Sequence, residues 1–306
     1  MPGAVTIECP AKVNLALAVE PPTADGMHPI LSWMLALSFS DQLEVERLDD
    51  SSTAPPESVF DLSFADDAPR PSEIDWPLAD DLAVRAHGLM EKRVGRKLPV
   101  RVTLRKRIPT GAGLGGGSSD AAGVIVAVDQ LFDLGLTAAD RHDLAGALGS
   151  DVHFALEALS GQTSAIVRGL GNVVEPAPPA GTWPIHLVLV LPPFGCPTGP
   201  VYSAFDELQA QEAASKAELT DMHELVHGFS PPGDDLFNDL ARPAASVQPG
   251  LGLLLDGLRR VSPYPPHVTG SGAACFVVVQ SAEEAHAMAE SIAAELDVVA
   301  IATQAR

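Results

Sequence analysis

The 306-residue chain has few cysteines, few aromatic residues, few basic residues and no long apolar segment. Its three cysteines, Cys9, Cys196 and Cys275, are scattered, which excludes a disulfide framework and a cysteine-based metal site of ordinary ligand spacing. No apolar run approaches the roughly 20 residues that a transmembrane helix needs. The first residues lack a basic region followed by an apolar one, so no secretory signal is expected. These absences predict a cytoplasmic protein without a membrane partner.

Positive charge is also scarce. The chain has 40 Asp and Glu against 19 Lys and Arg, and its net charge is −21. A field of that sign repels nucleic acids, so none is expected as a partner. Hydrophobic residues make up 46% of the chain, and its length suffices for two modest domains, each with a core. The composition therefore agrees with a soluble enzyme.

What the sequence does have is a glycine-rich segment, Pro-Thr-Gly-Ala-Gly-Leu-Gly-Gly-Gly-Ser-Ser, from Pro109 to Ser119. Without Cβ atoms the backbone can approach an anion closely, so several N–H groups can converge on one phosphate. Ser118, Ser119 and Asp120 suit the N-terminus of the apolar helix expected over residues 118–132, where the helix dipole favours anions. The segment therefore predicts a phosphate-binding loop.

Several known nucleotide loops do not match this segment. It is not a Walker A loop, because the chain contains no Gly-Lys-Ser or Gly-Lys-Thr. Gly111, Gly113 and Gly116 satisfy G-x-G-x-x-G, but the segment lies a third of the way along the chain, which disfavours a dinucleotide fold. No His-Arg-Asp or Asp-Phe-Gly follows, which excludes a protein kinase. A flexible linker is the remaining alternative, and the preceding proline and the following helix argue against it.

Three motifs occur in the order found in the GHMP small-molecule kinases, and the chain resembles that superfamily. They are Cys9-Pro-Ala-Lys-Val-Asn-Leu15, the segment from Pro109 to Ala122, and Val268-Thr-Gly-Ser-Gly-Ala-Ala-Cys-Phe276. Ala24-Asp-Gly-Met-His28 and Leu148-Gly-Ser-Asp-Val-His-Phe154 are similar to motifs of the branch whose substrate is 4-diphosphocytidyl-2-C-methyl-D-erythritol. The resemblance runs from about residue 7 to the end of the chain.

The resemblance implies an α+β fold of two domains. Residues 1–165 would form an ATP-binding domain like domain 2 of ribosomal protein S5, and residues 166–306 a ferredoxin-like domain. Local patterning agrees with this mixture. Strands are expected at 5–9, 43–47, 100–105, 186–191 and 276–279, and helices at 78–94, 118–132, 137–145 and 282–296. Residues 49–75 are expected to form an exposed loop or hairpin. The crossing between the two domains is expected before or within residues 172–184.

The implied activity is ATP- and Mg²⁺-dependent phosphorylation of the substrate's 2-hydroxyl, in non-mevalonate isoprenoid synthesis. Asp151 matches the catalytic aspartate of the family, although an aspartate before an apolar helix also suits an N-cap. Lys12 would orient the acceptor hydroxyl and lower its pKa. Asn14 shares a strand face with Lys12 if the segment is extended, and would bind substrate, or else form a turn.

Nucleotide binding is assigned to the glycine-rich segment and to a lysine before it. Lys106 stands where the family has a nucleotide-contacting lysine, although Lys106 and Arg107 would equally suit an exposed strand end. A magnesium ion is expected near Ser118, without direct ligation by the protein. The expected contacts are Lys106, Pro109, Gly111, Gly113, Leu114, Gly115, Gly116, Gly117, Ser118 and Ser119.

Substrate choice is assigned first to His28, whose family counterpart reads the edge of cytosine. Met27 replaces a tyrosine that stacks on the base, and Phe194 would provide the opposite face of the stack. His153 replaces a proline, and Asp81 replaces an asparagine that often contacts the nucleotide. The remaining expected substrate contacts are Thr198, Gly270 and Ser271.

Two alternatives remain open beside this interpretation. Another GHMP kinase, of the homoserine or mevalonate type, would share the three motifs, but Asp25, Gly26 and His28 disfavour it. A non-catalytic nucleotide-binding homologue would need neither Lys12 nor Asp151. A monomer and a homodimer are equally compatible with the sequence.

Overall fold

The computed structural model describes residues 3–48, 56–177, 184–209 and 221–306. The chain forms two compact units, each built from three segments. The first unit comprises Met1–Ala11, Phe39–Ile108 and Gly115–Gly161, and the second comprises Lys12–Ser38, Pro109–Leu114 and Gln162–Arg306. The division between family domains at residues 165 and 166 stays a prediction.

The first unit contains one end of a large sheet. Its strands follow the order β3-β4-β2-β1, where β1 is Ala4–Val19, β2 is Ile30–Arg47, β3 is Val59–Phe64 and β4 is Val100–Lys106. β4 runs antiparallel to β2 and parallel to β3. In β4, Val100, Val102 and Leu104 are buried, whereas the residues between them are more exposed, as expected of a strand with one covered face.

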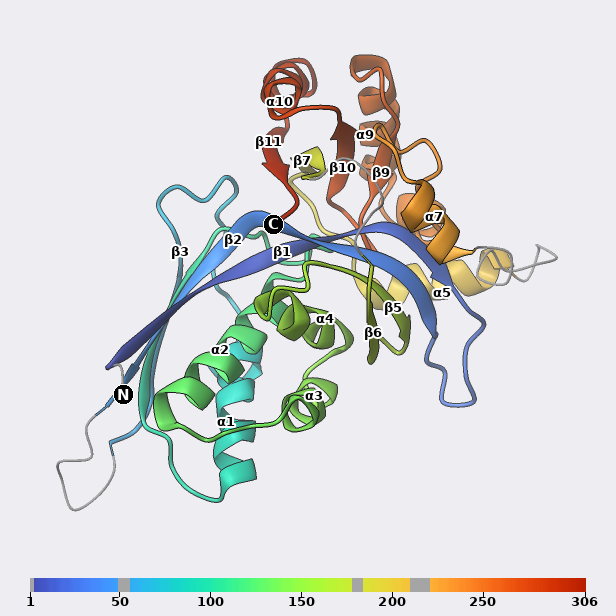
Figure 1. Ribbon diagram of the computed structural model, residues 1–306. Helices are drawn as coiled ribbons and strands as arrows, with labels where there is room; N and C mark the ends of the chain where they lie inside the picture. The colour runs from blue at the N-terminus through green and yellow to red at the C-terminus, as the bar shows by residue number, and fades with distance from the viewer. Residues whose placement is uncertain (1–2, 49–55, 178–183, 210–220) are drawn as a thin grey trace. The chain divides into compact units, whose positions relative to one another are not determined.

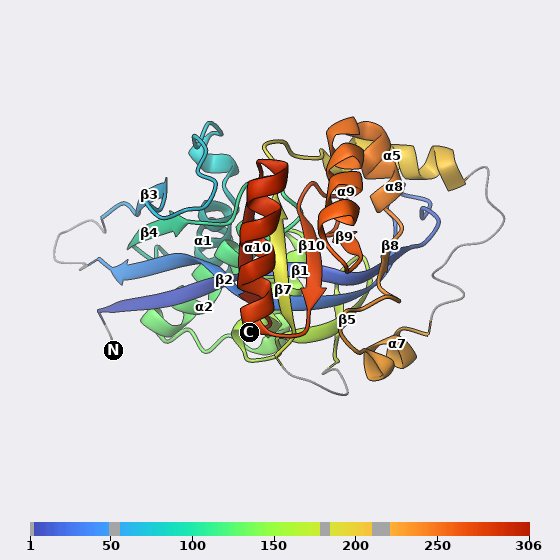
Figure 2. The ribbon, with the colours of Figure 1, turned by 90° about the horizontal axis from the view of Figure 1, so that it is seen from above.

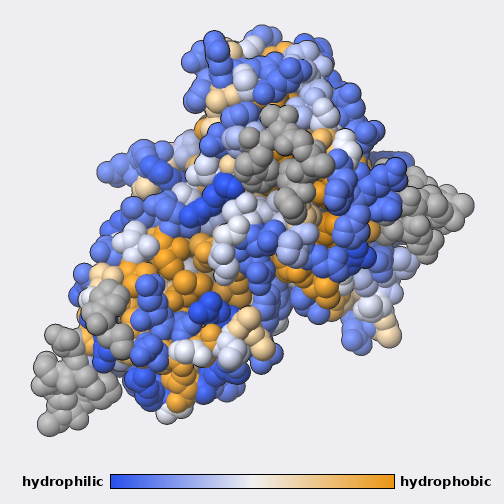
Figure 3. All heavy atoms as spheres, in the orientation of Figure 1, coloured by the Kyte–Doolittle hydropathy of each residue, from blue (hydrophilic) through white to orange (hydrophobic). Residues whose placement is uncertain are grey.

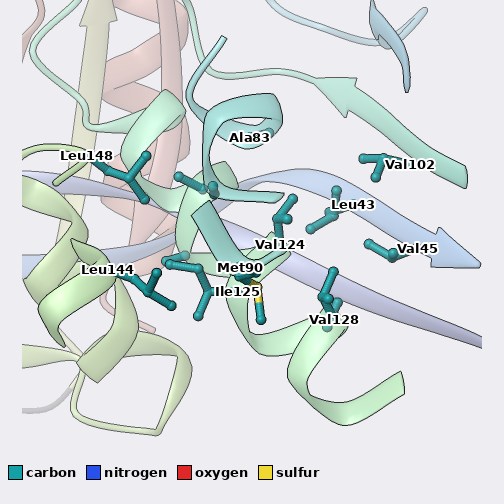
Figure 4. Close-up of a cluster of buried hydrophobic side chains, with 14 of the residues drawn as sticks. Leu43, Val45, Ala83, Met90, Val102, Val124, Ile125, Val128, Leu144 and Leu148 are labelled. Atoms are coloured by element: carbon teal, nitrogen blue, oxygen red, sulfur yellow. The ribbon is translucent and has the colours of Figure 1, made fainter. Parts of the chain in front are cut away.

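Helices cover one face of these strands (Figure 1). The helices are α1 (Leu82–Val94), α2 (Gly116–Phe132), α3 (Ala138–Gly146) and α4 (Ser150–Leu159), and a 3₁₀ turn, η1 (Leu78–Asp80), precedes α1. Leu43, Val45 and Val102 point from the sheet toward Val124 and Val128 of α2 (Figure 4). Gly123 allows this close packing, because a Cβ there would lie 2.6 Å from the sulfur of Cys9.

The second unit contains strand pairings of its own and a separate sheet. β5 (Ser164–Gly169) pairs with the start of β2 and with β6 (Val173–Pro176), and β8 (Phe237–Asn238) pairs with β1. The second sheet has the order β11-β7-β10-β9, where β7 is His186–Leu191, β9 is Pro266–Val268, β10 is Cys275–Val279 and β11 is Val299–Gln304.

Five helices complete the described part of the second unit: α5 (Thr198–Gln209), α7 (Met222–Gly228), α8 (Ala241–Val247), α9 (Pro249–Val261) and α10 (Ala282–Leu296). α9 and α10 cover one face of the second sheet (Figure 2). Their apolar residues, among them Leu251, Leu258 and Ile292, pack with Val188 and Val277 of the strands. Helices that pack by one face on a sheet are the α+β arrangement that the sequence predicts.

Most predicted elements are confirmed, and the differences lie at their ends. The strand 186–191 and the helix 282–296 have the observed bounds, and the strands 5–9 and 43–47 are parts of the longer β1 and β2. The helix expected from residue 78 starts at Leu82, because Asp81 accepts a hydrogen bond from the N–H of Ala83 and caps it. Within the loop or hairpin region 49–75, residues 59–64 form β3, and residues 49–55 lie outside the described part.

The segment predicted to contain the domain crossing, 172–184, includes β6, and its residues 178–183 lie outside the described part. All three cysteines are free and buried. None of the helices in the described ranges has the length and apolar character needed to cross a membrane. On the face drawn in Figure 3, hydrophobic residues reach the surface mainly among the helices of the first unit.

Candidate active site

The first half of the glycine-rich segment, Pro109–Leu114, belongs to the second unit, where backbone contacts fix it. The carbonyl of its last residue accepts a hydrogen bond from the N–H of Lys12 at 2.9 Å. At Gly113, φ is +78°, and a Cβ would lie 2.4 Å from the carbonyl oxygen of Thr269. Only glycine fits such a position, so this part of the loop is a closely packed structure. The alternative of a flexible linker is wrong here.

The second half of the segment belongs to the first unit and forms the N-terminus of α2. The helix begins at Gly116, two residues earlier than predicted, because Gly115 adopts φ +69° and serves as the N-cap. No side chain caps this end. The first intrahelical hydrogen bond runs from the N–H of Ser119 to the carbonyl of Gly115, at 2.9 Å. The N–H groups of the residues between them are therefore available to an anion.

A buried ion cluster lies beside this helix start. The Lys106 ammonium donates hydrogen bonds to Asp41 and Asp120, each at 2.6 Å, and is only 3% exposed. The other carboxylate oxygen of Asp41 accepts hydrogen bonds from the backbone N–H groups of Arg107 and Ile108. The cluster therefore ties the end of β4 to α2. The expectation of an exposed strand end is wrong for Lys106, whereas Arg107 is half-buried and pairs with Asp67.

The cluster holds two carboxylates and one ammonium, and this environment shifts the pKa values of Asp120 and Lys106. Burial raises the pKa of Asp120 to about 8; Lys106 opposes this rise and Asp41 adds to it. Burial opposes the charged form of Lys106, but the two carboxylates outweigh it and raise its pKa. Ser119 Oγ and Asp120 Oδ1 are buried and have no hydrogen-bond partner among the described residues. Such unpaired atoms are costly unless a ligand satisfies them.

Asp151 lies in the first turn of α4, in the first unit. The N-cap of this helix is Gly149, and no side chain caps it, so the interpretation of Asp151 as a helix cap is wrong. Its carboxylate is at the end of the helix where the dipole favours a negative charge. The position is therefore compatible with the predicted role of Asp151 as the base.

His153, two residues further along α4, joins a chain of hydrogen bonds. Its Nδ1 is 2.9 Å from Nδ1 of His142, whose Nε2 is 2.8 Å from the carboxylate of Glu157. Because a carboxylate only accepts, a neutral His142 carries its proton on Nε2 and accepts from His153. Burial, and then the neighbouring His142, lower the pKa of His153. His153, which stands where the family has a proline, therefore links α3 to α4 through His142.

In the second unit, Lys12 and Asn14 form the centre of a buried polar cluster. Lys12 Nζ donates to Asn14 Oδ1 at 2.7 Å, and Asn14 Nδ2 donates to Ser32 Oγ at 2.8 Å. The N–H of Asn14 donates to Thr269 Oγ1 at 3.0 Å. β1 continues to Val19, so the alternative of a turn at Asn14 is wrong and the expected shared strand face is confirmed.

The third motif lies against this cluster. A Cβ at Gly270 would be 3.4 Å from Lys12 Nζ, so the glycine leaves the space beside the ammonium open. The hydroxyls of Thr198 and Ser271, both predicted to contact substrate, lie 3.2 Å apart. The structure thus brings Lys12, Asn14, Gly270 and Thr269 together within one unit, and joins Thr198 to Ser271.

Aromatic rings of α5 surround His28, and the predicted stacking of Met27 and Phe194 on a base stays a prediction. Met27 is 54% exposed, and the aromatic rings next to His28 are those of Tyr202 and Phe205 on α5, with ring centroids 5.1 and 5.9 Å away. Phe194 instead packs on the N-terminal turn of α9, where a Cβ at Gly250 would come within 2.9 Å of its ring. The aromatic partners that the structure gives His28 are therefore Tyr202 and Phe205.

Several residues around the site were not predicted from the sequence. Asp41 and Tyr202 carry no local signal, because one lies within a strand and the other within an ordinary helix. Thr269 belongs to the third motif, and its position before Gly270 is the signal that would have identified it. Lys12 belongs to the second unit and Asp151 to the first.

Comparison with known proteins identifies the family. Residues 81–167 match the model of the GHMP kinases N terminal domain. The chain is 33% identical over 296 residues to the 4-diphosphocytidyl-2-C-methyl-D-erythritol kinase of Thermobifida fusca (strain YX), covering 96% of this chain and 92% of that protein. It is 34% identical over 298 residues to the enzyme of that name from Caulobacter sp. (strain K31), covering 92% of each chain.

Solved structures agree with these relatives. A crystal structure of 4-(cytidine 5'-diphospho)-2C-methyl-D-erythritol kinase matches with a TM-score of 0.74 and 30% identity, covering 99% of this chain and 100% of that one. Homoserine kinase from Cytophaga hutchinsonii matches with a TM-score of 0.66 at 13% identity, covering 100% of this chain and 95% of that one, which shows a shared fold. The chain has the two-domain α+β fold of the GHMP kinases and belongs to the 4-diphosphocytidyl-2-C-methyl-D-erythritol kinase family.

Proposed function

We propose that this kinase transfers the γ-phosphoryl group of ATP to the 2-hydroxyl of 4-diphosphocytidyl-2-C-methyl-D-erythritol. Membership of the family supports the substrate. The observation that carries the phosphoryl-transfer chemistry is the uncapped N-terminus of α2, which follows a loop with three glycines at positive φ. Phosphoryl transfer depends mainly on positioning and on neutralising charge, and such a helix start supplies both to a nucleotide.

Magnesium is the cofactor that this helix start would accommodate. The unpartnered oxygens of Ser119 and Asp120 are hard donors of the kind that Mg²⁺ or its bound waters prefer. Ser118, one residue earlier and half-buried, remains the predicted neighbour of the ion. Mg²⁺ would offset negative charge on the ATP phosphates, which a chain of net charge −21 otherwise repels. A direct nucleotide contact by Lys106 stays a prediction, and its two ion pairs support a role in holding the loop.

At the acceptor side, we assign Asp151 as the base that takes the proton of the 2-hydroxyl. Lys12 would orient that hydroxyl and lower its pKa through its positive charge. The hydrogen bond from Lys12 to Asn14 keeps the ammonium in one position, and Thr269 and Ser32 in turn hold Asn14. This supported arrangement is what positioning catalysis requires.

For the base of the substrate, we assign the stacking face to Tyr202. It lies in α5 beside His28, within the same unit, and its phenol ring offers a larger face than the thioether of Met27. The roles of Phe194, Thr198 and Ser271 in substrate binding stay predictions. The free, buried cysteines support a reducing compartment, and we propose the cytoplasm.

The direct test is ATP consumption with three alcohols offered separately: the cytidylylated methylerythritol, mevalonate and homoserine. We expect turnover with the first alone, and a product in which the phosphate is on the 2-hydroxyl. Turnover with mevalonate or homoserine would show that the proposed substrate is wrong, while the proposal of kinase activity would stand. The Asp151→Asn variant serves as the matched inactive control in each reaction.

A further inference from the structure

His142, on α3, bridges two side chains of α4. Its Nδ1 is 2.9 Å from Nδ1 of His153, and its Nε2 is 2.8 Å from the carboxylate of Glu157. His153 and Glu157 are four residues apart, so they lie one turn from each other on the same face of α4. The two imidazole rings are nearly parallel, at 13°, with centroids 5.2 Å apart. Two contacts one turn apart restrain both the position and the rotation of α4 relative to α3.

This restraint acts on the first turns of a helix that has no side-chain cap. α4 begins after Gly149, which has no side chain to accept hydrogen bonds from the helix start. Asp151 is the second residue of α4 and His153 the fourth, so the bridge is applied within about one turn of Asp151. Only 6% of His153 is exposed, so its ring is held by close packing. The position of Asp151 therefore depends on how firmly α3 holds His153.

α3 is a fixed support for such a bridge. A capping box of Thr137 and Asp140 closes its N-terminus. Arg141 donates a hydrogen bond to Asp129 of α2 at 2.6 Å, and Arg93 of α1 pairs with Asp140. Asp129 is buried, so salt screens its pair with Arg141 less than it screens a surface pair. α3 is thereby anchored to two other helices and can restrain α4.

We propose that His142 and His153 are positioning residues, which hold the first turn of α4 so that the carboxylate of Asp151 meets the acceptor hydroxyl in one orientation. The proposal rests on the proposed function, in which Asp151 is the base. It requires a hydrogen bond between the two facing imidazole nitrogens, and either ring can donate it. Positioning of this kind acts on the chemical step, because a small displacement of a reacting group lowers the rate of reaction.

Two substitutions of His142 divide its contacts. Asparagine carries a polar atom at about the place of Nδ1, so His142→Asn keeps the contact with His153 and loses that with Glu157. Glutamine reaches about the place of Nε2, so His142→Gln does the reverse. We expect His142→Gln to lower kcat about five- to twentyfold, within the range that a misplaced reacting group causes, with KM unchanged for ATP and for the alcohol. His142→Asn should have nearly the kcat of the wild type.

The order of these two variants separates positioning from stability. Glutamine is the better helix former, so an effect through the stability of α3 would make His142→Asn the poorer variant. Arg141→Met is the matched control, because it removes one anchor of the same helix and leaves Arg93 and both contacts of His142 in place. It should lower the melting temperature and leave kcat unchanged in assays well below that temperature. A loss of kcat in His142→Asn or in Arg141→Met that equals the loss in His142→Gln would overturn the proposal.

A measurement without substrate follows the start of α4 directly. The backbone amide signals of Ser150, Asp151 and Val152 in NMR spectra report on this turn. His142→Gln should shift these signals, whereas Arg141→Met should leave them in place, and unchanged signals in His142→Gln would refute the proposal. If the wild type phosphorylates none of the three alcohols, the proposed function fails, and these signals still decide whether His142 holds the turn.

Discussion

Asp151 and Lys106 are two charged residues in the sequence motifs, and their surroundings differ. The surroundings of Lys106 favour a structural role, and those of Asp151 are compatible with a chemical one. Lys106 is enclosed by two carboxylates in the protein interior, whereas Asp151 lies in the first turn of a helix that it does not cap. A side chain committed to buried ion pairs contributes to stability and positioning. The proposed role of Asp151 is chemical, because its helix is not capped by a side chain.

Replacing Asp151 by Asn should therefore affect catalysis and leave nucleotide binding intact. We expect kcat to fall by roughly 10²–10⁴, the usual contribution of a positioned proton acceptor. The dissociation constant for ATP, measured by calorimetry, should stay within about twofold of the wild type. A variant with nearly normal kcat would remove Asp151 from the role of base.

Replacing Lys106 by Met should destabilise the first unit. The change leaves Asp41 and Asp120 buried without their cation, and breaking one side of a buried ion pair costs about 3–5 kcal/mol. Urea unfolding measures the loss. Lys97→Met is the matched control, because its ion pair with Glu91 lies at the surface, where pairs contribute ~0–1 kcal/mol. Equal losses in the two variants would contradict a structural role for the cluster.

Asp120 also predicts a pH dependence of stability. Its pKa is raised by folding from its ordinary value of 3.8 to about 8, so the folded state keeps a proton that the unfolded state releases. The stability from this group is complete below about pH 4 and is lost as the pH rises toward about 8. Asp120→Asn should flatten the decline in unfolding free energy between pH 5 and 8, measured in urea, whereas exposed Asp75→Asn should not.

At the scale of elements, two glycines of the glycine-rich loop allow the effect of backbone strain to be compared with the effect of steric collision. Gly111 and Gly113 both have positive φ, but a Cβ at Gly111 meets nothing within 4 Å, whereas one at Gly113 would collide with the carbonyl of Thr269. Alanine costs about 1 kcal/mol of strain at either position. Only Gly113 carries a steric penalty in addition.

Gly113→Ala should therefore lower the melting temperature of the protein more than Gly111→Ala does, by several degrees in calorimetry. The two variants share the same substitution and nearly the same φ, so Gly111→Ala is the control. Equal shifts would mean that the loop moves away from Thr269 without resistance. In that case the close packing at Gly113 would not stabilise the loop.

Local sequence predicted the elements whose signals are local. Thr137 and Asp140 form the capping box expected before a helix, and the apolar run at residues 186–191 forms a buried strand. The start of α2 differs from the prediction because Gly115, and not a serine, is its N-cap. No helix-propensity rule identifies a glycine N-cap within a run of glycines, where every position tolerates the required conformation.

Contacts between distant segments set the limit of the site prediction. The resemblance of the first motif pointed to Lys12, and the shared strand face of Lys12 and Asn14 was expected if the segment is extended, as it is. The partners Ser32 and Thr269 lie 18 and 255 residues from Asn14 along the chain, and no spacing within one sequence reveals such neighbours. The contact of Tyr202 with His28, 174 positions away along the chain, is likewise hidden from local sequence.

At the scale of the whole molecule, charge is the dominant feature. The net charge of −21 repels both ATP and the diphosphate of the substrate at low ionic strength. Salt screens this repulsion, with a Debye length of about 10 Å at 0.1 M. The overall field therefore opposes binding, while the loop and its magnesium ion favour it locally.

We expect kcat/KM for ATP, at fixed free Mg²⁺, to rise between about 10 and 150 mM potassium chloride, because screening helps the anionic substrates approach. Steady-state kinetics at several salt concentrations measures this trend, and an uncharged viscogen controls for diffusion. A steady fall in kcat/KM over that range would mean that local cations, and not the net charge, govern the approach of ATP.

The interleaving of the two units has a consequence for synthesis of the chain. The first unit is complete once residue 161 has been made, whereas the second combines residues 12–38 with segments that continue to residue 306. Leu17 of β1 pairs with Asn238 of β8, so this pairing can form only after residue 238 has been synthesised. At ~5–20 residues per second, that delay is on the order of ten to forty seconds. A nascent chain therefore has β2 beside β1 early in synthesis, whereas the β8 side of β1, at Ala16 and Leu17, stays unpaired until residue 238 has been made.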